Sequence, residues 1–118
     1  LDLGLARGFT PESLAAIDIP VLVIAAGSPN PKIPKELESG YLIEHLPTDL
    51  TRYHDLPGAA HFSFLPECKP NAAILLESEI PGDGIICLDG DDETDRAKLH
   101  QQTISVILDF LRQIKTAS

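Results

Sequence analysis

The chain has 118 residues, of which 43% are hydrophobic and 23% charged, a composition typical of a globular protein rather than a disordered one. The 9 Lys and Arg residues stand against 18 Asp and Glu residues, and the formal net charge of −9 argues against binding to nucleic acid or to anionic lipid, because both need clustered basic side chains. The longest apolar runs, 19–26 and 72–76, fall far short of the roughly 20 residues of a membrane-spanning helix.

The first predicted element is a short helix over residues 10–17. Thr10 is a suitable N-cap, since its side-chain oxygen can accept a hydrogen bond from the first turn. Pro11 falls at the first helical position, where proline is favoured. Leu14 and Ile17 are spaced to form one apolar stripe along this helix.

A continuous apolar run from Ile19 to Ala26 follows and is stopped by Gly27. The run is rich in β-branched residues, which is typical of a strand buried on both faces. Such strands occur mainly in parallel sheets that helices cover. The run therefore predicts a strand over 20–26 in a parallel sheet.

A proline-rich loop over 28–34 separates this strand from a second predicted helix, which opens at Pro34 and closes before Pro47. Residues 51–56 are predicted to form a short second strand. The second helix carries an apolar face at helical spacing, formed by Leu37, Tyr41, Leu42 and Leu46.

Residues 57–94 are predicted to form a long loop, and residues 95–115 the clearest helix of the chain. Thr94 or Asp95 stands where an N-cap is expected. The apolar stripe of this last helix consists of Ile104, Ile107, Leu108, Leu111 and Ile114.

The predicted order of elements is therefore helix, strand, helix, strand, long loop, helix. Such alternation favours right-handed βαβ units with a parallel sheet, so the fold class is α/β. Two strands and three helices cannot bury both faces of a sheet, and strand 20–26 would leave an apolar edge unpaired. We therefore expect residues 1–118 to be the C-terminal segment of one doubly wound domain. The absence of Met and the start at Leu1 agree with a piece of a longer polypeptide.

Two cysteines, Cys68 and Cys87, are spaced in a way that fits no zinc site. They can be two buried thiols, or a disulfide that closes a loop of about 20 residues and is worth on the order of 3 kcal/mol. Segment 77–95 is rich in Gly and Asp and has little apolar surface, so a covalent link there would replace missing core. A disulfide would indicate an oxidising compartment, and hence a periplasmic or secreted protein.

The most informative local motif is LPGAAHFSF, residues 56–64. A strand ends in a Pro-Gly turn, and a lone histidine, His61, follows at the carboxyl end of the strand, where ligands and reacting groups gather in open α/β sheets. A histidine there can act as a general base, because imidazole gains and loses a proton near neutral pH. The alternative is a structural histidine that caps a loop. Phe62 and Phe64 can line an acyl pocket or belong to the core.

The order IPVLVIAAG (19–27), helix, LPGAAHFSF (56–64) resembles the C-terminal end of an α/β-hydrolase. More narrowly, HFSFLPEC (61–68) followed by ICLDGDDETDRAKLH (86–100) and a final helix resembles the predicted dienelactone-hydrolase-like enzymes, which are related to platelet-activating-factor acetylhydrolases. The resemblance covers essentially the whole chain. It implies that His61 is the histidine of a catalytic triad and that Cys68 and Cys87 form a disulfide beside the site.

The acid of the triad follows from the same resemblance. Many α/β-hydrolases place it after the penultimate strand, but the loop 27–34 contains no carboxylate. The acetylhydrolase-like branch places an Asp one strand earlier, in a segment of the Leu-Asp type, as in LDLG at residues 1–4. The resemblance thus implies that Asp2 orients His61 and stabilises its imidazolium, the alternative being a frayed terminal residue. Weaker candidates for the acid are Asp18 and Asp55.

The nucleophile is missing, because no G-x-S-x-G elbow occurs in the chain, and neither Ser28 nor Ser63 stands in such a turn. In α/β-hydrolases the order is Ser, acid, His, so the nucleophile and the oxyanion hole are expected upstream of Asp2. The first functional hypothesis is part of a serine hydrolase that cleaves small-molecule carboxylic esters or similar acyl substrates without a cofactor. This chain alone would then be inactive. The second is a non-catalytic, disulfide-stapled α/β module that pairs with a partner chain through the open edge of strand 20–26.

Two further groups of residues do not fit a metal site. The acidic run 89–93 fails the calcium-binding EF-hand template, which needs Gly at its sixth position and Glu at its twelfth, where Thr94 and His100 stand. We expect the run to be solvated and to favour the N-terminus of the last helix. The histidines that are not spaced as metal ligands are His45, His54 and His61.

Overall fold

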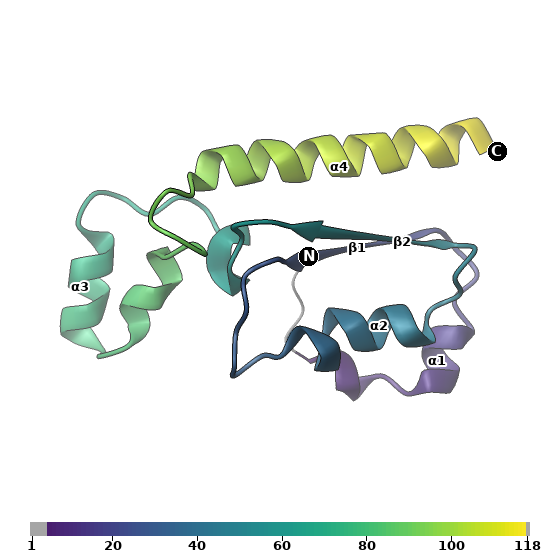
Figure 1. Cartoon of the computed structure of the whole chain (residues 1–118), viewed down its shortest axis with the longest axis horizontal. Helices are drawn as coiled ribbons and strands as arrows, with labels where there is room; N and C mark the ends of the chain where they lie inside the picture. The colour runs from purple at the N-terminus through teal and green to yellow at the C-terminus, as the bar shows by residue number, and fades with distance from the viewer. Residues whose placement is uncertain (1–4, 118) are drawn as a thin grey trace.

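The computed structural model describes residues 5–117 (Figure 1). It is a mixed α/β structure with a two-stranded parallel sheet and flanking helices. The strands are β1 (Val21–Ala26) and β2 (Thr51–Leu56), and the α-helices are α1 (Pro11–Ala15), α2 (Ser39–His45), α3 (Ala72–Glu79) and α4 (Arg96–Ala117). Short 3-10 turns are η1 (Ala6–Gly8), η2 (Lys35–Leu37), η3 (His61–Phe64) and η4 (Asp83–Cys87).

The sheet confirms both predicted strands and their parallel direction. Val21 pairs with Thr51, and the register continues to Ala26 and Leu56. α1 and α2 cover one face of the sheet and α4 the other (Figure 1). Because side chains alternate along a strand, Ile24 packs toward α4 while Val23 packs toward α1 and α2.

Two apolar clusters fill the two faces. The cluster under α4 consists of Ile24, Ala26, Leu56, Ala59 and Leu99. The cluster on the other face consists of Leu14, Val23 and Leu46, with Ile17, Tyr41 and Leu42 packed against it. The prediction that the first strand is buried on both faces is therefore confirmed for its second half.

α1 begins as the sequence predicts. The Thr10 hydroxyl accepts a hydrogen bond of 3.2 Å from the Ser13 backbone N–H, and Pro11 occupies the first helical position. Leu14 is buried. The helix ends at Ala15, two residues earlier than predicted, because only a short connection leads from it to β1.

The prediction that the second helix is one continuous element is wrong. The chain forms η2 and then breaks at Glu38, where φ is −118° and ψ is −98°, before α2 begins. The Glu38 side chain is buried and accepts a hydrogen bond of 2.8 Å from the Ala6 backbone N–H. This contact ties η1 to the break. Of the predicted apolar face, Leu37 is exposed and Leu46 is buried.

The prediction of a long loop over 57–94 is also wrong, because α3 lies within it. We name residues 65–90 the α3 excursion; in Figure 1 it stands beyond the carboxyl ends of both strands. It contains α3 and η4, and the disulfide Cys68–Cys87 closes it with a Cα–Cα distance of 5.7 Å. The disulfide prediction is confirmed. A disulfide is compatible with an extracytoplasmic protein.

α4 confirms the last predicted helix, with Asp95 as its cap. The Asp95 carboxylate accepts a hydrogen bond of 2.9 Å from the Ala97 backbone N–H. The helix packs on the sheet through Leu99, Thr103 and Val106. Most of the apolar stripe predicted from the sequence is exposed, namely Ile104, Ile107, Leu108 and Leu111. Within residues 5–117, no helix is both long and apolar enough to cross a membrane.

Candidate functional site

The loops that follow the two strands are joined at the carboxyl edge of the sheet. The Gly27 N–H donates to the Leu56 carbonyl at 2.9 Å, and the Ser28 N–H donates to the Ala59 carbonyl at the same distance. A Cβ on Gly27 would lie 2.6 Å from that Leu56 oxygen, so this close approach requires glycine. Gly58 has a φ of +77°, which turns the chain sharply after β2.

His61 lies where the sequence predicts, immediately beyond this turn. It is the first residue of η3 and is half-buried, with its ring edge-on to Phe62 at a centroid distance of 4.9 Å. A pocket of about 290 Å³ opens beside it. The walls of this pocket come from segments 28–31, 60–62 and 85–90. We name it the His61 pocket.

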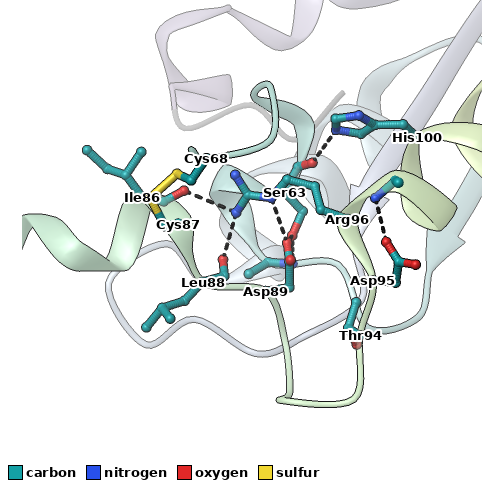
Figure 2. A network of polar contacts seen from close by, with 12 residues as sticks. Ser63, Cys68, Ile86, Cys87, Leu88, Asp89, Thr94, Asp95, Arg96 and His100 are labelled. Atoms are coloured by element: carbon teal, nitrogen blue, oxygen red, sulfur yellow. Dashed lines mark hydrogen bonds and ion pairs between the residues drawn. A yellow bond between two sulfur atoms is a disulfide. The ribbon is translucent and has the colours of Figure 1, made fainter. Parts of the chain in front are cut away.

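Ser63 holds the η3 turn in place. Its hydroxyl accepts a hydrogen bond of 2.8 Å from the Ala60 backbone N–H and donates one to Asp89. Its carbonyl lies 2.9 Å from His100 Nε2 (Figure 2). Ser63 is 1% exposed, so the structure places it as a structural residue, in agreement with its exclusion as the nucleophile.

A buried ion pair joins this turn to the α3 excursion. Arg96 Nε lies 3.1 Å from Asp89 Oδ1, and the two side chains are 6% and 9% exposed. The rest of the guanidinium donates to backbone carbonyls of the excursion. These are Ile86 at 3.1 Å and Leu88 at 3.1 Å (Figure 2), and Pro66 at 3.4 Å. Four of the five N–H groups of the Arg96 guanidinium thus have acceptors, one of them the Asp89 carboxylate, as the burial of a charge requires.

The sequence analysis did not identify Arg96 as a residue of the site, and it predicted the wrong surroundings for Asp89. The expectation of a solvated acidic run is wrong for Asp89, whose carboxylate bonds to both Ser63 and Arg96. It is right for Asp92 and Glu93, which are exposed. Asp91 forms a local turn with the backbone of Glu93 and the side chain of Thr94. The only signal in the sequence was an arginine at the start of a helix, where a cation is disfavoured by the helix dipole.

The two phenylalanines have different places. Phe62 lines the His61 pocket, whereas Phe64 packs against the apolar cluster under α4. Phe64 therefore belongs to the core, as one of the two interpretations predicts, whereas an acyl-binding role for Phe62 stays a prediction.

The acid candidates are not equivalent. Asp2 lies outside the described residues. Asp55 forms an ion pair with Lys35, with 2.6 Å between Nζ and Oδ2, and Asp18 is exposed at the end of α1.

Of the other histidines, His45 contacts Tyr41 on α2 with a ring distance of 4.5 Å. In the described part of the chain, no group of three or more His, Cys, Asp or Glu side chains could hold a metal ion.

No protein-family model, curated protein or solved structure matches the chain. Its function must therefore be argued from the site itself. The site offers one half-buried imidazole at the rim of a pocket, on a turn that buried polar contacts hold in place.

Proposed function

We propose that this chain supplies the acid–base part of a serine hydrolase of the α/β-hydrolase type, acting on small-molecule carboxylic esters. The observation that carries the proposal is the position of His61, at the carboxyl edge of β2 and in the wall of the His61 pocket. Reacting groups of open α/β sheets gather at this edge. The nucleophilic serine and the oxyanion hole would come from sequence that precedes Asp2.

In this proposal His61 moves the proton in both halves of the reaction. One ring nitrogen takes the proton of the serine hydroxyl as the oxygen attacks the ester carbonyl, and then gives it to the leaving alkoxide. A water molecule repeats the sequence on the acyl-enzyme. Asp2, which lies outside the described residues, would accept a hydrogen bond from the other ring nitrogen and hold the imidazole in the correct tautomer.

The two flanks of α4 support a larger sheet. The flank beside the outer edge of β2 is polar and is formed by Lys98, Gln102, Ser105 and Asp109. Another flank of the helix is apolar and exposed, and is formed by Ile104, Ile107, Leu108 and Leu111. Polar residues fit the end of a sheet, whereas exposed apolar residues need a covering element. Further parallel strands beside β1 would provide it, as in a doubly wound domain.

The dimensions of the chain agree with this argument. Its radius of gyration is 16.0 Å, whereas a compact domain of this length is expected near about 13.5 Å. A chain that forms one part of a larger domain would have such an extended shape.

A fluorophosphonate probe, which labels activated serines, tests the proposal on the full-length protein. We expect one serine upstream of Asp2 to be labelled, and His61→Gln to slow labelling by a factor on the order of 10²–10⁴, the usual contribution of a general base. His54→Gln is the matched control, because His54 is a half-buried histidine on β2 outside the His61 pocket. The proposal fails if no serine is labelled, or if both variants behave alike.

A second candidate function rests on the same apolar flank. The chain would then be a non-catalytic module, closed by its disulfide, that pairs with a partner chain through the free edge of β1. Native mass spectrometry separates the candidates. A stable complex whose partner carries no probe-reactive serine favours the module, and a labelled serine in the same polypeptide favours the hydrolase.

A further inference from the structure

An apolar groove runs between α3 and η4 in the α3 excursion. Its volume is about 670 Å³, and most of its wall surface is apolar, although Glu77 and Ser78 also line it. The large side chains that line it are Ile74, Ile85 and Leu88, which are 71%, 51% and 55% exposed. Exposed apolar surface gathered in a groove is typical of a binding site, because water solvates it poorly.

The groove adjoins the His61 pocket. Ile85 and Leu88 line both of them. A molecule whose carbonyl lies beside His61 would therefore place its next carbons over these two side chains and its far end against Ile74.

The walls of the groove are held by polar and covalent contacts rather than by core. The Glu77 carboxylate on α3 accepts hydrogen bonds from the backbone N–H of Gly82, at 3.0 Å, and of Gly84, at 3.1 Å. A Cβ on Gly84 would lie 3.0 Å from Glu77 Oε2 and 3.2 Å from the Ala73 carbonyl, so glycine allows η4 to approach α3. The disulfide Cys68–Cys87 and the bond from Arg96 to the Leu88 carbonyl hold the other end. The groove is thus formed before a ligand arrives.

We propose that the groove binds the aliphatic acyl chain of the ester that His61 helps to cleave, so that the substrates are esters of medium-chain fatty acids. The inference rests on the proposed function. Its occupant follows from the two side chains shared with the His61 pocket and from a wall surface that is mostly apolar and has no aromatic ring, with Glu77 and Ser78 as its polar members, which fits a flexible methylene chain. A fully buried methylene is worth about fourfold in binding, so one half-covered by an open groove should give about twofold.

The test compares p-nitrophenyl acetate, hexanoate and decanoate as substrates of the full-length protein. We expect kcat/KM to rise about twofold per methylene. Ile85→Asn, near His61, should flatten the series from hexanoate onward, whereas Ile74→Asn, at the far end, should lower kcat/KM for decanoate alone. Ile80→Asn is the matched control, because Ile80 is an exposed isoleucine of the same excursion outside the groove.

A titration with decanoate, followed through the isoleucine methyl resonances, tests the groove without catalysis. We expect the signals of Ile74 and Ile85 to shift and that of Ile80 to stay. Ester hydrolysis with equal rates along the series, or with rates that the two groove variants leave unchanged, would overturn the acyl groove while the hydrolase stands. If no ester is hydrolysed, the proposed function falls and the acyl groove falls with it. If decanoate still shifted the methyl signals, the groove would be an apolar binding site without a role in hydrolysis. If the methyl signals did not change, the groove would not bind decanoate at all.

Discussion

The sheet and the α3 excursion are ordered by different forces. Around the sheet, Ile24 and Leu56 are each 2% exposed and lie in an apolar cluster under α4. In the excursion, residues 65–90, no large apolar side chain is buried; Gly84 and the carboxylate of Asp89 are the groups withdrawn from water. There the chain is held by the disulfide, by Glu77 and by the guanidinium of Arg96.

This difference shows that a segment can be shaped without a core of its own. Burial of apolar area stabilises the sheet, but the side chains that are buried there can no longer contact a ligand. Covalent and polar contacts made through the backbone leave the isoleucines and leucines of the excursion exposed. A segment built in this way can present apolar surface to a ligand and keep its shape.

The largest effect is expected from Arg96→Met. The variant leaves Asp89 buried without its cation and leaves carbonyls of the excursion without their donor. Loss of one partner of a buried ion pair costs about 3–5 kcal/mol. Hydrogen exchange should show the amides of residues 83–90 opening first, ahead of those of β1.

Arg112→Met is the control, since it removes an arginine from the same helix. Arg112 pairs with Asp109 at 2.9 Å, but these side chains are 73% and 65% exposed. Its loss should cost less than about 1 kcal/mol. Equal losses for the two arginine variants would contradict the view that Arg96 orders the excursion.

A core variant should affect the other region. Ile24→Ala removes buried methyl groups from the cluster under α4 and should lower the free energy of unfolding by about 2–5 kcal/mol. Urea unfolding followed by circular dichroism measures this loss. Ile19→Ala, at an exposed isoleucine before β1, should change stability by less than about 0.5 kcal/mol. If the Ile24 variant lost structure only at residues 65–90, this would contradict the view that the apolar cluster stabilises the sheet rather than the excursion.

Removal of the disulfide should weaken the excursion by an intermediate amount. The double variant Cys68→Ser/Cys87→Ser frees a loop whose ends are 19 residues apart. The entropy of such a loop corresponds to about 3 kcal/mol. Reduction of the wild-type protein with dithiothreitol should shift the urea midpoint equally, and an unchanged midpoint would show that polar contacts alone suffice.

The smallest effect is expected from the exposed ion pair of the sheet region. The hydrogen bond to Asp55 raises the pKa of the Lys35 ammonium above its usual 10.5. Lys35 therefore stabilises the fold below pH 10.5, and this contribution is lost as the pH rises through the raised pKa. The two side chains are 40% and 41% exposed, so Lys35→Met should cost only about 0.2–1 kcal/mol.

Urea unfolding near about pH 8 and about pH 12 checks this sign. The difference between wild type and Lys35→Met should be present at the lower pH and vanish at the higher one. Lys32→Met, an exposed lysine of the same loop, should show no such pH dependence. A difference that persists at high pH would rule out the ion pair as its cause.

β1 could be predicted from its continuous apolar run, and α4 from a long apolar pattern at helical spacing. α3 could not, since its apolar residues are spread around the helix and Ile74 and Leu75 are exposed. Its stability comes from the disulfide and from Glu77, which periodicity does not register. Similarly, the position of His61 follows from a strand ending in a Pro-Gly turn. The hydrogen bond between Ser63 and Asp89 joins residues that are 26 positions apart in the sequence. It removes from water a carboxylate that the composition of its segment predicts to be solvated.

Asp89 Oδ1 accepts from the Ser63 hydroxyl and from Arg96 Nε at once (Figure 2). One oxygen atom is therefore common to the turn that carries His61 and to the anchor of the excursion. By thermodynamic linkage, any coupling through this oxygen is reciprocal, so that order in the excursion stabilises the turn as much as order in the turn stabilises the excursion. We expect a ligand that rigidifies the excursion also to steady the turn that carries His61.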